Sequence, residues 1–323
     1  MKAVIHTRYG GPEVLGLAEI ERPIVADDGV LVRVRATEVT AADWRMRAAA
    51  FPGALWLPGR LMAGLIRPKK PVLGTDFAGE VAEVGARVAR FRPGDRIFGF
   101  SGAGAYAEFL AIPEAGCIAA IPQGLGFEEA AALPFGALTA LVFLRDFAGL
   151  EPGQRVLVTG ASGGVGVYAV QIARALGAEV TAAASAANLE LLRSLGATHA
   201  LDYRAEDIAP AGAGYDLIFD TVGALSFPKA RRALKPAGLF LPLEFAGREM
   251  LQALWAKLRG GPRIRLAISG DTQEDLETLA AMIGEGKLRP VIDRRYPLER
   301  IAEAHAYVQG RHRKGSVIVT IDA

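Results

Sequence analysis

The pattern of hydrophobic and polar residues changes along the chain. Up to about residue 122, short apolar runs are separated by glycine and proline turns, and residues 30–35 place valine at every second position. A period of two is typical of a β-strand with a buried face. Similar short runs recur at 95–100 and 106–112, so this part of the sequence predicts a small β-rich domain.

From about residue 123 to 269, apolar runs alternate with amphipathic segments. A glycine follows each of the two helices expected here, as is common just past a helix end. Strand–helix alternation at this spacing predicts right-handed βαβ units and a doubly wound parallel sheet of the α/β class. The predicted strands and helices cover, in chain order, 155–159, 166–176, 179–184, 189–195, 215–220 and 238–243.

The remaining part contains two predicted helices, 273–283 and 298–309, and a last strand at 316–321. Because this strand resembles those of the first part, we expect it to return there. The sequence therefore predicts one domain formed by residues 1–122 and 270–323, and a second formed by residues 123–269.

Composition and charge exclude several classes of protein. The formal net charge is +2 and the basic residues are scattered, which argues against nucleic acid as a main partner. The start, MKAVIHTRYGGPEVL, lacks the apolar run of a secretory signal. Cys117 is the only cysteine, so no internal disulfide can form. We therefore expect a cytoplasmic protein.

Two apolar stretches are candidates for a membrane span, and neither fits. Residues 51–73 are interrupted by several glycines and prolines, and residues 250–258 are too short. A bilayer requires a helix of roughly 20 uninterrupted apolar residues. The sequence therefore predicts no integral membrane segment.

A glycine-rich turn, VLVTGASGGVG at 156–166, joins a predicted strand directly to a predicted helix. Dinucleotide pyrophosphates bind where backbone N–H groups meet a helix N-terminus and side chains leave room for close approach. Gly163 and Gly164 would admit the phosphates, and Gly166 would let the helix pack on its strand. The candidate cofactor-binding residues of the turn are Ser162, Gly163, Gly164, Val165 and Gly166.

The turn alone is compatible with two families of oxidoreductase. Short-chain dehydrogenases resemble one another in having this turn near the N-terminus and a downstream Tyr-x-x-x-Lys. Here the turn lies mid-chain, and no tyrosine after it is followed by lysine at the fourth position. The short-chain interpretation therefore fails.

Several motifs in a fixed order resemble the zinc-less quinone-oxidoreductase branch of the medium-chain dehydrogenase/reductase superfamily. They are PVLGTDFAGEVAEVGARVARFRPGDRIFGF at 71–100, GALTA at 136–140, LRSLGATHALDYR at 192–204 and YDLIFDTVG at 215–223. The resemblance covers essentially the whole chain. It implies a GroES-like β-rich domain, a Rossmann domain and a nicotinamide cofactor.

The zinc-dependent members of this superfamily place a catalytic cysteine where this chain has Thr40, and a His-Glu pair where it has Thr75 and Asp76. Threonine is a poor zinc ligand, and the four histidines show no metal-ligand spacing. The sequence therefore predicts no zinc. Without a Lewis acid, hydride transfer suits a carbon that is already electrophilic, such as that of a small hydrophobic quinone or an α,β-unsaturated carbonyl (enone).

Members of this branch often carry Asn-Pro-x-Asp-x-Tyr where residues 40–45 of this chain lie. The resemblance implies that Thr40 lies near the nicotinamide ribose and that Asp43 holds the local structure. Arg45 replaces the tyrosine, and either Arg45 or Arg47 could stabilise a developing enolate, unless both are ordinary surface arginines. Thr139, in GALTA, matches a position beside the nicotinamide; its alternative role is an ordinary helix hydroxyl.

The preference between the two nicotinamide cofactors depends on the end of the second Rossmann strand. Ser185 stands where an NADH enzyme would carry an acid, which favours NADPH, although NADH remains possible. Asn188, Tyr203 and Arg204 match positions near the adenosine, and arginine suits a phosphate. Val222 belongs to the motif at 215–223 and completes the candidate cofactor site.

Three functions stay open at this point. The first is an NADPH-dependent quinone or enone reductase. The second is an enoyl-thioester reductase, for which Arg60, Arg67, Lys69 and Lys70 could bind a coenzyme A or carrier-protein phosphate. The third is a non-catalytic protein that binds NADPH for a structural or sensing role. We also expect a homodimer, paired through the strand-like residues 263–269.

Overall fold

The computed structural model describes residues 1–51 and 56–322. The chain separates into two compact units. Unit 1 comprises Met1–Phe51, Trp56–Leu138 and the chain from Asp271 onward, and unit 2 comprises Thr139–Gly270. The domain limits expected from the sequence stay a prediction. Compactness alone does not show that a unit folds independently.

Unit 1 is built on a seven-stranded sheet with the order β14-β15-β3-β4-β5-β7, and β6 pairs with β3 outside this path. The last strand pairs antiparallel with β3, placing Val319 opposite Thr37 as the expected return of the chain requires. A separate hairpin joins β1 (Lys2–Ile5) and β2 (Gly16–Glu19). The strands of the large sheet are β3 (Gly29–Glu38), β4 (Asp76–Val84), β5 (Arg96–Phe100), β6 (Phe109–Pro113), β7 (Cys117–Ala120), β14 (Ile292–Pro297) and β15 (Ser316–Thr320).

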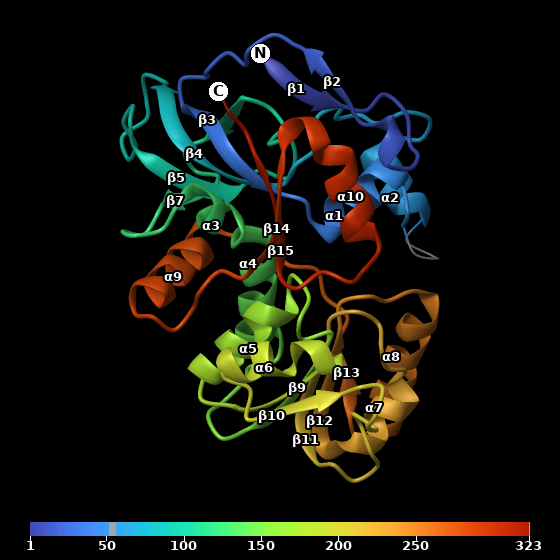
Figure 1. The fold of residues 1–323 in the computed structure, drawn as a ribbon. Coiled ribbons are helices and arrows are strands. Elements are labelled where there is room, and N and C mark those ends of the chain that lie inside the picture. Colours follow the sequence, from blue (N-terminus) through green and yellow to red (C-terminus); the bar gives the residue numbers. More distant parts are fainter. Residues whose placement is uncertain (52–55, 323) are drawn as a thin grey trace. The chain divides into compact units, whose positions relative to one another are not determined.

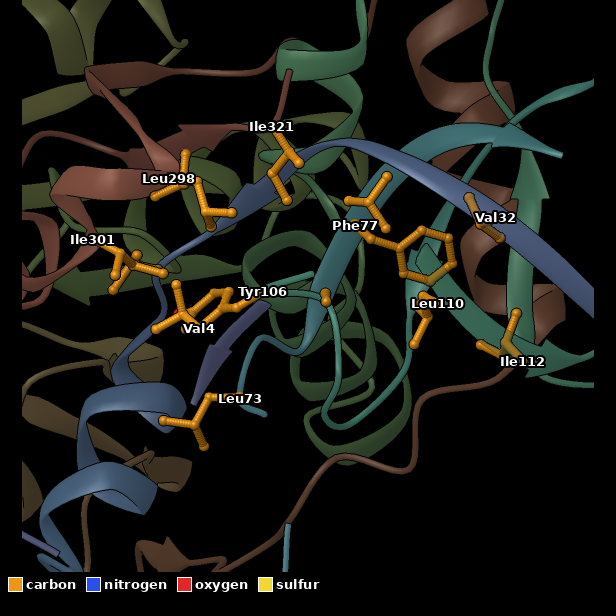
Figure 2. Close-up of a cluster of buried hydrophobic side chains, with 14 of the residues drawn as sticks. Val4, Val32, Leu73, Phe77, Tyr106, Leu110, Ile112, Leu298, Ile301 and Ile321 are labelled. Atoms are coloured by element: carbon orange, nitrogen blue, oxygen red, sulfur yellow. The ribbon is translucent and has the colours of Figure 1, made fainter. Parts of the chain in front are cut away.

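The core of unit 1 brings both ends of the chain together (Figure 2). Val4 from the first strand and Ile301 from a C-terminal helix belong to the same buried cluster as Phe77 and Tyr106. The helices of this unit are η1 (Pro12–Val14), α1 (Ala41–Ala48), α2 (Trp56–Ala63), α3 (Phe127–Ala131), α9 (Gln273–Gly284), η5 (Leu298–Arg300) and α10 (Ile301–Gln309). The helices expected at 273–283 and 298–309 are thus confirmed, with a first 3-10 turn in the second.

Unit 2 contains a six-stranded parallel sheet with the order β10-β9-β8-β11-β12-β13 (Figure 1). This order reverses direction beside β8, as in a doubly wound nucleotide-binding sheet. Its elements are β8 (Arg155–Thr159), α5 (Gly166–Ala175), β9 (Glu179–Ala184), η4 (Ala186–Asn188), α6 (Leu189–Ser194), β10 (His199–Asp202), β11 (Tyr215–Asp220), α7 (Phe227–Ala233), β12 (Leu234–Pro242), α8 (Gly247–Arg259) and β13 (Arg263–Ile264). The predicted α/β class with a parallel sheet is confirmed.

The connection before this sheet is helical. Helix α4 (Pro134–Val142) runs into the π-helical turn η3 (Phe143–Phe147). In the described parts of the chain, no helix is long and apolar enough to cross a membrane.

One strand is much shorter than the sequence predicts. Only Arg263 and Ile264 of the stretch 263–269 form a strand, β13. The amide of Arg265 still donates to the Phe240 carbonyl at 3.0 Å. The next bond of a parallel ladder would need an amide at Pro242, and proline has no N–H to donate. The strand therefore stops after Ile264, although the alternation of apolar residues continues along 263–269.

Candidate functional site

The glycine turn lies where β8 passes into α5, at the point where the strand order reverses. Gly160 has a φ of +60°, which favours glycine. A Cβ added at Gly166 would lie 2.2 Å from the Gly160 carbonyl oxygen, so a side chain there cannot be accommodated without a shift of the backbone. The turn is therefore folded tightly against the N-terminus of α5.

A buried carboxylate supports the turn from the neighbouring strand. Asp220, at the end of β11, accepts a hydrogen bond from the Thr159 hydroxyl at 2.6 Å and one from the Leu225 amide at 2.9 Å. Its position fixes the segment that follows β11. Val222 in this segment is 40 % exposed, and a Cβ added at Gly160 would lie 2.5 Å from the Val222 Cγ1 atom. The predicted cofactor residue Val222 thus lies directly against the turn.

Three predicted cofactor residues meet at the end of β9. The Asn188 amide nitrogen donates to the Ser162 hydroxyl at 3.1 Å and to the Ser185 hydroxyl at 3.3 Å. Asn188 is only 8 % exposed, and its Oδ1 atom is buried with no hydrogen-bond partner among the residues described. An unsatisfied buried acceptor of this kind favours a ligand that supplies a hydroxyl or another donor.

The segment after β10 brings two more candidates, Tyr203 and Arg204, to the same edge of the sheet. The Tyr203 amide donates to the Ala184 carbonyl, the last residue of β9, at 3.1 Å. Tyr203 is 51 % exposed, and the Arg204 guanidinium carbon lies 5.5 Å from the centre of its ring. An exposed aromatic ring beside a cation can stack on a base and bind a phosphate.

In unit 1, Thr40 and Asp43 form a reciprocal cap at the start of α1. The Thr40 hydroxyl donates to Asp43 Oδ2 at 2.6 Å and accepts from the Asp43 amide at 3.2 Å. The other oxygen, Asp43 Oδ1, accepts from the Gly74 amide at 3.2 Å. Both side chains are buried, so Asp43 ties α1 to the segment before β4.

The two candidate arginines of α1 differ in their surroundings. Arg47 is fully buried and donates to the Gly10 carbonyl at 3.2 Å and to the Gln309 side chain at 2.6 Å. These bonds join α1 to the segment before η1 and to α10, so Arg47 has a structural role. Arg45 is partly exposed, with its guanidinium carbon 5.6 Å from the Trp44 ring centre.

Two further buried carboxyl groups lie in the same unit as Asp43. Arg313 donates to Glu38 at 3.4 Å and to the Val39 carbonyl at 2.9 Å. Burial raises the pKa of Glu38, although the Arg313 charge opposes this shift. Burial also raises the pKa of Asp76, and the charge of Glu38 adds to that effect.

Asp76 links this group of acids to α4. Its Oδ2 atom accepts from the Phe135 amide in the first turn of α4 at 2.8 Å. A carboxyl group at this end of a helix satisfies a backbone donor that the helix itself leaves unpaired. Helix α4 carries the predicted residue Thr139, which is 8 % exposed.

Comparison with known proteins places these two units in one family. Residues 26–123 match the alcohol dehydrogenase GroES-like domain family, and residues 195–319 match the zinc-binding dehydrogenase family. The chain is 33 % identical to the chloroplast envelope quinone oxidoreductase homolog of Arabidopsis thaliana, over 99 % of this chain and 98 % of that protein. The chain belongs to the medium-chain dehydrogenase/reductase superfamily.

Two further comparisons bear on the branch of this superfamily. The chain is 32 % identical to the chloroplastic NADPH-dependent alkenal/one oxidoreductase of Arabidopsis thaliana, over 99 % of this chain and 79 % of that protein. The structure of Escherichia coli quinone oxidoreductase complexed with NADPH matches with a TM-score of 0.83 and 25 % identity, over 99 % of this chain and 100 % of that one. The predicted fold, a Rossmann sheet with a GroES-like β-rich domain, is confirmed.

The residues of this chain do not fit a zinc ion at the catalytic zinc site of the zinc-dependent members of the superfamily. The hydroxyl of Thr40 is engaged on both sides by Asp43. The Cys117 thiol donates to the Thr272 carbonyl at 3.2 Å, and burial raises its pKa to about 12, which disfavours the thiolate that zinc binds. Residues 1–51 and 56–322 contain no group of three or more His, Cys, Asp or Glu side chains suited to a metal.

Sequence reasoning missed three residues that position this site: Glu38, Asp76 and Asp220. A signal existed for Asp220, because a carboxylate at the end of a buried strand must find local donors. Asp76 was noted only as a replacement for a zinc ligand, and its bond to α4 depends on a contact 59 residues away. Glu38 gave no signal, because its partner Arg313 is separated from it by 275 residues.

Proposed function

We propose that this chain is a zinc-independent oxidoreductase that uses NADPH to reduce quinones and α,β-unsaturated carbonyl compounds. The observation that carries the proposal is the site at the end of β9, where Ser162, Ser185 and Asn188 meet without a carboxylate. The names of the relatives, quinone oxidoreductase and NADPH-dependent alkenal/one oxidoreductase, support the same class of acceptor.

The cofactor would bind along unit 2. The turn from Ser162 to Gly166 would hold the pyrophosphate, and Val222 would contact it from the segment after β11. Ser185 and Asn188 would hydrogen-bond the adenosine ribose, because the buried Asn188 Oδ1 atom needs a donor. Tyr203 and Arg204 would bind the adenine and the 2′-phosphate.

The proposed reaction requires the protein to position the acceptor beside NADPH more than to activate it. Bound NADPH supplies the hydride. A quinone or enone is electrophilic at a conjugated carbon and leaves a stabilised anion, so no metal is needed to polarise it. Thr40, held by Asp43, and Thr139 are the residues of this chain that we assign to the nicotinamide end of the site.

The proton that completes the reaction has no fixed donor in this proposal. Arg45 can stabilise an enolate or quinolate oxyanion by its charge, because it is the partly exposed arginine of α1. Arg47 is excluded from that role by its buried bonds to Gly10 and Gln309. Solvent can then protonate the anion.

We also infer a homodimer and a cytoplasmic location. β13 pairs only with β12 in the described sheet, so its other edge is open to a second copy. A strand of two residues gives that pairing little length, and a monomer mass by sedimentation would contradict the dimer.

The proposed cytoplasmic location rests on the single cysteine, and a compartment marker experiment in the source cell would test it.

The test is to measure NADPH oxidation with p-benzoquinone, methyl vinyl ketone and crotonyl-CoA in parallel. We expect turnover with the quinone and the enone that exceeds turnover with crotonyl-CoA. Preference for crotonyl-CoA would instead identify an enoyl-thioester reductase. Tight NADPH binding without turnover of any acceptor would identify a non-catalytic nucleotide-binding protein.

A further inference from the structure

Helix α2 and the turn after it expose an unusual concentration of large apolar side chains. Ile66 is 87 % exposed and Met62 is 66 % exposed, whereas side chains of this kind are commonly buried. Three cations follow closely in the chain. We call this set the α2 surface; it consists of Trp56, Leu57, Leu61, Met62, Leu65, Ile66, Arg67, Lys69 and Lys70.

The α2 surface is held by contacts to Tyr9 and by contacts between its own residues. The Tyr9 hydroxyl donates to the Gly64 carbonyl at 2.7 Å, and the Lys69 ammonium donates to the Leu61 carbonyl at 2.7 Å. The Arg60 guanidinium carbon lies 4.2 Å from the centre of the Tyr9 ring. The apolar side chains are therefore presented by an ordered helix and turn.

The stretch of sequence that contains this surface carries charge of one sign. Between Asp43 and Asp76 the sequence contains six lysines and arginines and no aspartate or glutamate. Five of these six cations lie outside the protein interior, since Arg47 alone is fully buried. Two copies of this face would repel each other, so the charge favours a partner with negative charge and an apolar interior.

We propose that the α2 surface docks the protein on the surface of an anionic phospholipid bilayer. Aliphatic side chains and a tryptophan would enter the boundary between headgroups and acyl chains, and Arg67, Lys69 and Lys70 would contact the lipid phosphates. Each apolar side chain of the α2 surface is more than half exposed and protrudes singly. A fluid lipid bilayer can close around each such side chain. This inference goes beyond the proposed function and does not depend on it.

The experiment is flotation of the full chain with vesicles, in the absence of nucleotide and acceptor. One set of vesicles contains phosphatidylcholine only, and the other contains phosphatidylcholine with phosphatidylglycerol. We expect binding to the anionic vesicles at low salt and much weaker binding at high salt, because the cations are screened. Trp56 fluorescence, isolated by comparison with Trp56→Phe, should shift to shorter wavelength on binding.

Matched variants distinguish binding through the α2 surface from nonspecific binding to lipid. Ile66→Ser should lower the vesicle partition coefficient by roughly tenfold, because burial of an isoleucine side chain is lost. Lys70→Gln should lower it by roughly fivefold. The controls are Ile24→Ser, at an isoleucine that is 93 % exposed, and Lys287→Gln, and both should leave binding unchanged.

Three results would overturn the proposal. The first is equal binding to neutral and anionic vesicles. The second is an equal loss of binding in Ile66→Ser and in Ile24→Ser. The third is a protein dimer that Ile66→Ser abolishes while no vesicle binding is seen, which would make a second copy of the chain the occupant. Thermal unfolding of each variant confirms that it is folded.

Discussion

At the scale of single residues, the proposed preference for NADPH depends on the absence of a carboxylate beside Asn188. Ser162 and Ser185 both accept hydrogen bonds from the Asn188 amide nitrogen, so the end of β9 is polar and uncharged. A 2′-phosphate meets no repulsion from these three side chains. We therefore expect the residue at position 185 to decide whether NADPH or NADH is favoured.

Ser185→Asp should reverse this preference. A carboxylate placed there repels the 2′-phosphate and accepts from the ribose hydroxyl of NADH, and like charges in contact cost several kcal/mol. We expect kcat/KM for NADPH to fall by at least roughly tenfold relative to that for NADH. Ser194→Asp, at the exposed end of α6, is the matched control. An unchanged ratio in Ser185→Asp would show that the cofactor lies elsewhere.

The Thr40 hydroxyl is a second residue-scale determinant, because it holds the buried Asp43 carboxyl. Burial raises the pKa of Asp43, and the hydrogen bonds from Thr40 and Gly74 oppose that shift. Thr40→Val should lower the free energy of unfolding by about 1–3 kcal/mol, measured by denaturant titration. Thr40→Ser keeps the hydroxyl and should cost much less; equal losses in both variants would argue that the methyl group matters instead.

At the scale of elements, the β8–α5 connection requires glycine at one point in particular. Gly166→Ala would place a Cβ 2.2 Å from the Gly160 carbonyl, and relief of that overlap moves the turn. We expect the Kd for NADPH to rise by roughly tenfold or more, since overpacking costs about 1–3 kcal/mol. Gly284→Ala, in α9, meets nothing within 4 Å and should leave NADPH binding intact. Isothermal titration of both variants checks this, and equal affinities would refute it.

Helix α10 carries a buried histidine that the sequence did not single out. His305 is fully buried against Tyr106, with ring centres 5.6 Å apart, and in the described chain neither of its ring nitrogens has a hydrogen-bond partner. The buried imidazole is therefore held by packing rather than by hydrogen bonds from the described residues. Burial lowers the pKa of His305 to about 3.

This shift predicts a specific pH dependence. The unfolded chain binds a proton at His305 near the ordinary value of 6.5, whereas the folded chain does so near 3, so stability falls as the pH drops through that window. Relative to His305→Phe, wild type should lose about 1.4 kcal/mol per pH unit below pH 6.5. Denaturant titrations of both proteins at several pH values measure the difference. A difference independent of pH would contradict the burial of a neutral imidazole.

The elements also show what the sequence could and could not predict. Strands β8, β9 and β11 begin and end at the predicted residues, because buried parallel strands are continuous apolar runs. The short β13 was missed because its length depends on Pro242 in a neighbouring strand. Side-chain networks such as Glu38–Arg313 were missed because they join residues far apart in sequence.

At the scale of the whole molecule, the chain combines a six-stranded parallel sheet with a β-rich unit whose core includes both ends of the chain. The superfamily contains zinc-dependent and zinc-independent enzymes. In this chain, the Thr40 hydroxyl is hydrogen-bonded to Asp43, and the half-buried Cys117 thiol donates to the Thr272 carbonyl. We therefore expect reduction to proceed with NADPH and without zinc.

The most direct test is steady-state oxidation of NADPH by p-benzoquinone after the protein has been stripped with a strong chelator and its zinc content measured. We expect kcat to be unchanged by stripping and not to increase on addition of Zn²⁺. Loss of activity on stripping, with recovery on addition of Zn²⁺, would contradict it.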